Sequence, residues 1–110
     1  MHYSAGDSGA VHSTVKERWI NRDPSLVQGM QTLGSYADRG RDALALQNYD
    51  ELGRLMDLNF QMRRQLYGDD VVGAGNIAAV NLANDLGFAA KFTGSGGAIL
   101  CLFRRNCLEW

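Results

Sequence analysis

A glycine-rich turn near the C-terminal end restricts what this chain can fold into. The sequence Gly94-Ser95-Gly96-Gly97 separates two apolar runs, 88–93 and 98–103, and each run begins directly after a glycine. Short apolar runs of this kind are typical of strands, and the short connection between them predicts a hairpin. Before residue 87 the apolar residues recur every three or four positions, which is the period of an α-helix. We therefore expect an α+β fold in which helices precede strands.

Four helices are predicted before the hairpin. The first covers 11–21, and the second starts where Asp23 can cap it and Pro24 fits the first turn. The third starts at Asn48, because Asn48 and Glu51 together resemble a capping box, and it ends near Tyr67-Gly68. The fourth starts irregularly at Asp69-Asp70 and ends at Gly87. The side chains expected to face a core are Val11, Val15, Trp19 and Ile20, then Leu26, Met30, Leu33, Ala37 and Leu44, then Leu52, Leu55, Met56, Phe60 and Leu66, and finally Ile77, Val80, Ala83 and Leu86.

Composition narrows the class of protein. A chain of 110 residues with 45% apolar and 21% charged residues is long enough for one domain with a core. The net charge of −1 argues against non-specific nucleic-acid binding and against a basic membrane surface. No apolar stretch approaches the length of a membrane span, and the first residues do not read as a signal peptide. We therefore expect a cytoplasmic protein with no membrane partner.

The chain has two cysteines, Cys101 and Cys107, and neither belongs to a Cys-x-x-Cys or Cys/His pattern. Two thiols cannot build a disulfide framework, and a zinc site would lack ligands. We expect no metal site formed by these residues. Cys101 lies inside the apolar run 98–103 and is expected to be a small buried thiol.

The glycine loop is the best candidate for chemistry. Consecutive glycines allow backbone N–H groups to converge on an anion. Thr93 and Ser95 add hydroxyl groups and Lys91 adds a positive charge, so the loop suits a phosphate or a carboxylate. Gly96 is expected to need a positive φ angle or a close approach to a ligand. A plain hairpin turn remains the alternative, since the loop matches neither a Walker A loop nor a dinucleotide-binding glycine motif.

The order of several segments gives the loop a context. The stretch 87–98 closely resembles the third conserved motif of the superfamily of galactokinase, homoserine kinase, mevalonate kinase and phosphomevalonate kinase (GHMP kinases). Residues 7–15 with Arg18-Trp19, then 58–64, 68–74 and Asn76-Ile77, continue the likeness in the same order. Within the superfamily these segments look most like glucuronokinases. The resemblance covers about 7–103, most of the chain.

The resemblance implies a fold and an activity. It implies an incomplete C-terminal, ferredoxin-like GHMP kinase domain over 11–103, preceded by a polar segment, 1–10, and followed by a tail, 104–110, that shows no resemblance. The parent enzyme would use ATP and Mg²⁺ to phosphorylate the anomeric hydroxyl of glucuronate. The family's ATP phosphate loop, Pro-x-x-x-Gly-Leu-Gly-Ser-Ser, is absent from the sequence. We therefore expect a C-terminal lobe clipped at both ends and inactive alone, with the catalytic residues in the N-terminal lobe.

The resemblance also implies site residues. The loop residues would lie against phosphates and the acceptor sugar, and four further residues become possible substrate contacts. The loop set is Lys91, Thr93, Gly94, Ser95, Gly96 and Gly97, and the further contacts are Asn59, Arg63, His12 and Ser13. Simpler roles compete. His12 and Ser13 near a helix start suit capping or solvent exposure, and Arg63-Arg64 suit a solvated surface or pairing with Asp57 and Glu51. Asp69-Asp70 suit a helix N-terminus better than a metal or base role.

Two classes of function therefore compete. One is the C-terminal lobe of a sugar-acid kinase, whose partners are a small sugar acid and ATP. The other is a non-enzymatic helical module that binds another protein, with the glycine loop as a turn. In either case two strands alone leave unpaired edges, so self-association through them is expected.

Overall fold

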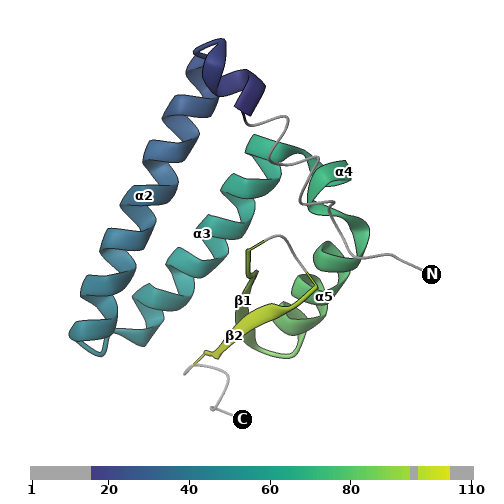
Figure 1. Cartoon of the computed structure of the whole chain (residues 1–110). Coiled ribbons are helices and arrows are strands. Elements are labelled where there is room, and N and C mark those ends of the chain that lie inside the picture. The colour runs from purple at the N-terminus through teal and green to yellow at the C-terminus, as the bar shows by residue number, and fades with distance from the viewer. Residues whose placement is uncertain (1–15, 95–96, 105–110) are drawn as a thin grey trace.

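The computed structural model describes residues 16–94 and 97–104. Residues 16–20 are helical, and the elements that follow are α2 (Pro24–Ala45), α3 (Tyr49–Tyr67), α4 (Asp69–Val72), α5 (Ala74–Asp85), β1 (Phe88–Phe92) and β2 (Ile99–Phe103). Figure 1 shows α2 and α3 as a long antiparallel pair, with the β1–β2 hairpin between α3 and α5. The predicted α+β order, helices before a hairpin, is confirmed, and the strand bounds agree to within a residue.

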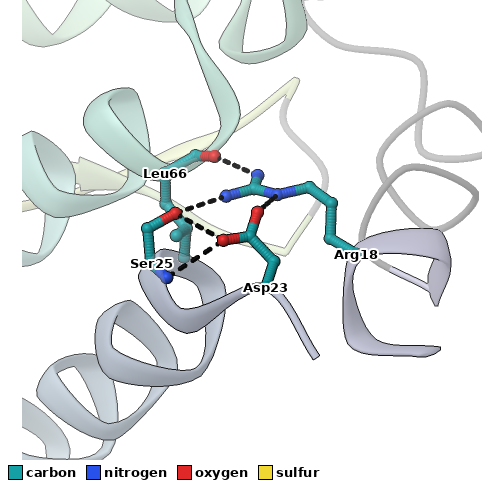
Figure 2. A network of polar contacts seen from close by, with 4 residues as sticks. All are labelled: Arg18, Asp23, Ser25 and Leu66. Carbon is teal, nitrogen blue, oxygen red and sulfur yellow. Dashed lines mark hydrogen bonds and ion pairs between the residues drawn. The ribbon is translucent and has the colours of Figure 1, made fainter. Parts of the chain in front are cut away.

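The start of α2 is fixed by a polar network (Figure 2). The Asp23 carboxylate accepts hydrogen bonds from the backbone N–H and the hydroxyl of Ser25, at 3.0 and 2.9 Å, so the predicted N-cap is confirmed. Arg18 pairs with the same carboxylate at 2.8 Å and also donates to the Leu66 carbonyl oxygen at 2.6 Å. These hydrogen bonds lower the pKa of Asp23 to about 2. Arg18 thus ties the start of α2 to the end of α3.

The structure corrects the burial predicted for the first helix, in the residues from 16 onward that it describes. Trp19 and Ile20 are 60% and 65% exposed, not packed in a core. The reason is that Arg18, and not the apolar side chains, faces the molecule and binds Leu66. Val11 and Val15 lie outside the described residues.

Helices α2 and α3 pack closely where Gly29 of α2 meets Leu66 of α3. A Cβ atom added to Gly29 would stand 2.7 Å from Cδ1 of Leu66, so this glycine permits the contact. Leu26 is fully buried in the interface, and Met30 and Leu33 are partly buried. The predicted inward positions Ala37 and Leu44 are wrong: both are exposed and line a groove, because no described element covers that side of α2.

Helix α3 follows its sequence pattern. Asn48 caps it by accepting from the Glu51 N–H at 3.2 Å, although the Glu51 side chain pairs with Arg54 and does not complete the box. The predicted inward residues of α3 are buried except Leu52, which is partly exposed; the buried ones are Leu55, Met56, Phe60 and Leu66.

The predicted fourth helix is broken into two. Gly73, at φ 92°, ends α4 after one turn and starts α5 in a new direction. Gly68, at φ 87°, and not an aspartate, is the N-cap residue of α4. Val80 and Ala83 are buried as predicted, Ile77 is partly buried, and Leu86 is 64% exposed because it lies beyond the helix end.

The hairpin is antiparallel, with Ala90 opposite Cys101 and Phe92 opposite Ile99. Strand β1 is buried from both sides, since α3 and α5 both contact it. Phe60 of α3 meets the Phe92 ring edge to face, with centroids 5.9 Å apart. The main buried cluster around this contact consists of Phe60, Val72, Val80, Ala83, Ala90 and Phe92.

Strand β2 is covered far less than β1. Among the described residues the sheet has two strands, so β2 has β1 as its neighbour on one edge and none on the other. The expectation that Cys101 is buried is therefore wrong: its thiol is exposed. Leu100 and Phe103 are 52% and 39% exposed for the same reason.

Candidate functional site

The glycine loop joins β1 to β2 at the end of the hairpin. The Thr93 N–H donates to the Ala98 carbonyl oxygen at 3.2 Å and closes the loop. Gly94 and Gly97 have positive φ angles of 41° and 86°, and a Cβ at either position would meet no atom within 4 Å. Their backbone conformation, and not lack of space, requires glycine. Ser95 and Gly96 lie outside the described residues.

Arg63, predicted as a possible substrate contact, reaches the loop from α3 and binds its backbone. Its guanidinium donates to the carbonyl oxygens of Phe92, at 3.3 Å, and of Gly94, at 2.6 Å. The same group lies 4.0 Å from the centroid of the Phe92 ring, a cation–π contact. Burial lowers the pKa of Arg63 from its usual value. The side chain therefore holds the first end of the loop.

Asn76 holds the other end and was not among the candidates. Its Oδ1 accepts from the Gly97 N–H at 3.3 Å, and its Nδ2 donates to the Val72 carbonyl oxygen at 3.1 Å. Asn76 is 4% exposed. The sequence contained a usable signal, because this amide shares the buried face of α5 with Val80 and Ala83. A buried polar side chain needs partners, and here one partner is the loop.

Lys91 lies on β1, one residue before Phe92, and is half-buried. Its ammonium donates to the Phe92 carbonyl oxygen at 3.2 Å, so this oxygen accepts from both Lys91 and Arg63. Burial, and then the nearby Arg63 charge, lower the pKa of Lys91. Two cations thus stand at the base of the loop, which favours an anion nearby.

Asn59 lies one helical turn before Arg63 on α3. Its Oδ1 is buried without a hydrogen-bond partner among the described residues. Asn59 lines an open, largely apolar groove of about 460 Å³ between α2, α3 and the hairpin. The other residues that line it are Tyr36, Ala37, Gly40, Arg41, Leu44, Leu52, Leu55, Met56, Lys91 and Leu100. Asn59 and Lys91 therefore share one surface, although Asn59 does not contact the loop through any described hydrogen bond.

The remaining candidates separate from the loop. His12 and Ser13 lie outside the described residues. Asp69 forms a two-fold ion pair with Arg64, at 2.8 Å for both bonds, which lowers the pKa of Asp69. Of the simpler roles suggested for Arg63 and Arg64, the pairing with Asp57 and Glu51 is wrong. Those acids pair with other arginines instead, Asp57 with Arg104 and Glu51 with Arg54 and Arg39.

Neither a metal-binding cluster nor a membrane-spanning helix is found in the part of the chain that the structure describes. No three or more His, Cys, Asp or Glu side chains gather there closely enough to hold a metal ion. No helix in that part combines the length and apolar character that crossing a membrane requires.

Comparison with known proteins places the chain in a family. Residues 41–106, more than half of the chain, match the family described as GHMP kinases C terminal. The chain is 47% identical over 94 residues to Glucuronokinase 1 and to Probable glucuronokinase 2 of Arabidopsis thaliana. The alignments cover 86% of this chain and 26% of each relative, so the chain spans about a quarter of their length. No solved structure gives a significant match. The chain belongs to the GHMP kinase C-terminal family.

Proposed function

We propose that this chain is the C-terminal part of an ATP-dependent sugar-acid kinase that phosphorylates the anomeric hydroxyl of glucuronate. The proposal extends the 47% identity to two glucuronokinases, of which the chain matches about a quarter. Its second part is that the 110 residues alone are inactive, because the phosphate loop and the catalytic residues belong to the other part of such an enzyme.

The single observation that carries the proposal is the held glycine loop. Its described ends, Thr93-Gly94 and Gly97-Ala98, are exposed, while the side chains that hold them are partly or fully buried. An exposed loop with a fixed backbone can present N–H groups to an anion at little reorganisation cost. Lys91 and Arg63 add two positive charges beside it.

In the proposed reaction, the sugar hydroxyl oxygen attacks the γ-phosphorus of ATP and ADP leaves with the bridging oxygen. The hydroxyl proton passes to a base outside the described residues. Such transfers depend mainly on positioning and charge stabilisation, which a loop of this kind supplies by donating N–H groups to phosphate oxygens. We assign no Mg²⁺ ligand among the described residues, where no three or more His, Cys, Asp or Glu side chains gather.

The proposal is tested in a chimera in which the 94 matched residues replace their counterpart in Arabidopsis Glucuronokinase 1. Hydrogen–deuterium exchange at the Gly94 amide is measured with and without a non-hydrolysable ATP analogue and glucuronate, since the N–H groups of Thr93 and Gly97 already bond to Ala98 and Asn76. We expect bound ligands to slow exchange at Gly94 at least about tenfold, because a contact with phosphate protects an exposed N–H. Arg54 on α3 and Asn81 on α5 are the controls. They lie on the helices that carry Arg63 and Asn76 but away from the loop, so their amide exchange should not change.

The opposite outcome would support the alternative function. If the folded chimera binds the ATP analogue but exchange at the loop does not change, the loop is a structural turn. This result would favour the alternative function, a helical module that binds another protein.

A further inference from the structure

The two ends of the glycine loop are held by helices on opposite sides of β1. Arg63 of α3 binds the carbonyl oxygens before and within the loop, and Asn76 of α5 binds the Gly97 N–H after it. We propose that Arg63 and Asn76 are a pair of positioning residues that together fix the loop, and that neither acts by contacting substrate.

The geometry of Arg63 suits this role better than a substrate contact. A guanidinium is a planar fork, and this one spans two carbonyl oxygens two residues apart while it lies over the Phe92 ring. No carboxylate of the described residues pairs with it. Its donors serve the loop backbone, and a lysine ammonium is too compact to make the same two-carbonyl bridge.

Asn76 complements Arg63 from the other side. Its amide is almost fully buried and uses one donor and one acceptor at once, toward the Val72 carbonyl and the Gly97 N–H. Its Nδ2 donates to the carbonyl oxygen of Val72, the last residue of α4, directly before the break at Gly73. The loop is therefore attached to the α4–α5 bend as well as to α3.

The two anchors are connected through the loop itself. The bond from the Thr93 N–H to the Ala98 carbonyl oxygen lies between them and closes the loop. If either anchor is lost, the loop remains attached at one end and gains conformational freedom at both. We therefore expect the two anchors to act as a unit, so that their losses are not additive.

The first experiment uses the 110-residue chain and measures amide exchange by NMR. We expect Arg63→Gln and Asn76→Ala each to speed exchange at both Thr93 and Gly97 by at least about tenfold. The matched controls, Arg54→Gln on α3 and Asn81→Ala on α5, replace exposed side chains of the same types and should leave both amides unchanged. An anchor variant that affects only its nearer amide would overturn the coupling.

A second variant separates loop positioning from folding. Asn76→Asp keeps an oxygen that accepts from the Gly97 N–H, although burying a carboxylate destabilises the protein. We expect Gly97 exchange in Asn76→Asp to stay within about threefold of the unchanged chain. If Asn76→Asp and Asn76→Ala speed exchange equally, the effect comes from lost stability and the positioning role is wrong.

The kinetic experiment rests on the proposed function and uses the chimera. We expect Arg63→Gln and Asn76→Ala each to lower kcat about 10- to 100-fold while the KM values for ATP and glucuronate change less than about threefold. The double variant should be within about threefold of the worse single variant. Arg63→Lys should restore less than about a tenth of the lost kcat, because the charge alone cannot bridge two carbonyls.

Different failures identify different errors. An inactive but folded chimera contradicts the proposed function, while the exchange results still decide the positioning role. An active chimera in which Arg63→Gln raises one KM selectively shows that Arg63 binds substrate and contradicts the inference. An active chimera in which the two losses multiply shows that the two residues act independently and contradicts their action as a pair.

Discussion

At the scale of single residues, the contacts that fix the candidate site are made to backbone groups of the loop and not between side chains. Arg63 and Lys91 both donate to the carbonyl oxygen of Phe92, and Asn76 accepts from the N–H of Gly97. These contacts hold the two ends of the loop, while Thr93, Gly94 and Gly97 stay exposed. The identity of Gly94 and Gly97 is then set by their positive φ angles.

Gly97→Ala tests whether the loop conformation matters for turnover, and Gly68→Ala is its matched control. The two glycines have φ angles of 86° and 87°, and neither has an atom near the added Cβ. Each variant should lose about 1–2 kcal/mol of unfolding free energy in urea titrations, because alanine disfavours this conformation. In the chimera, only Gly97→Ala should lower kcat/KM, by about tenfold or more. Equal effects of both variants on kcat/KM would contradict a specific role for the loop.

The pKa of Asp23 predicts a pH dependence for the polar network at the start of α2. Its pKa is lowered from 3.8 to about 2, mainly by the hydrogen bond from Arg18. A lowered carboxylate pKa stabilises the folded state above the unfolded value, and the contribution is lost as the pH falls from 3.8 toward 2. Asp23→Asn should therefore be less stable than the unchanged chain at neutral pH and equal to it near pH 2. Thermal unfolding followed across this range checks it, and a constant difference in stability would contradict the role of the ion pair.

At the scale of elements, local sequence signals predicted where helices and strands lie better than which of their side chains are buried. Asp23, Asn48 and Gly87 marked helix ends correctly because capping depends on neighbouring residues alone. The predicted burial was wrong at Trp19, Leu44 and Cys101, because burial depends on which element lies opposite. In the site, the loop was singled out and Arg63 was predicted only as a possible substrate contact, whereas the structure has its side chain bind loop carbonyl oxygens. Asn76 was missed because its contact with Gly97 depends on how α5 packs against the hairpin.

Replacing two helical glycines by alanine should change the stability of the chain in opposite directions, because α3 packs closely on the hairpin and the middle of α2 does not. A Cβ at Gly53 would lie 3.2 Å from the Cβ of Ala89, and neither atom can move without shifting its backbone. Gly53→Ala should therefore destabilise the chain by about 1–3 kcal/mol, although alanine favours helix. Gly34 lies in α2 with open space around it, so Gly34→Ala should stabilise the chain by about 0.5–1 kcal/mol. Urea unfolding measures both, and a stabilising Gly53→Ala would show that α3 and β1 are less tightly packed than described.

At the scale of the whole molecule, one side of the hairpin is well packed and the other is open. Strand β1 is buried between α3 and α5, whereas β2 exposes Leu100, Cys101 and Phe103. The groove beside Leu100 is open too. An uncovered strand with exposed apolar side chains favours pairing between copies, so the isolated chain should be prone to association.

Self-association of the isolated chain is therefore expected to run through β2. Light scattering after size exclusion should show species larger than a monomer, because an uncovered strand edge with exposed apolar side chains pairs readily. Leu100→Lys, which places a charge on that strand, should shift the distribution toward monomer. Leu82→Lys is the control, since Leu82 is 61% exposed on α5 away from the hairpin. A wild-type monomer at high concentration, or an equal effect of both lysines, would contradict association through β2.

The most direct measurement of the central claim is ATP-dependent formation of glucuronate 1-phosphate by the chimera, followed by ³¹P NMR beside the unmodified Arabidopsis enzyme and the isolated chain. If these residues are the C-terminal part of a sugar-acid kinase, the chimera should form the product with a kcat/KM within about 100-fold of the unmodified enzyme. The isolated chain should form none. A chimera that folds, melts cooperatively and binds ATP but transfers no phosphate to glucuronate would contradict the account.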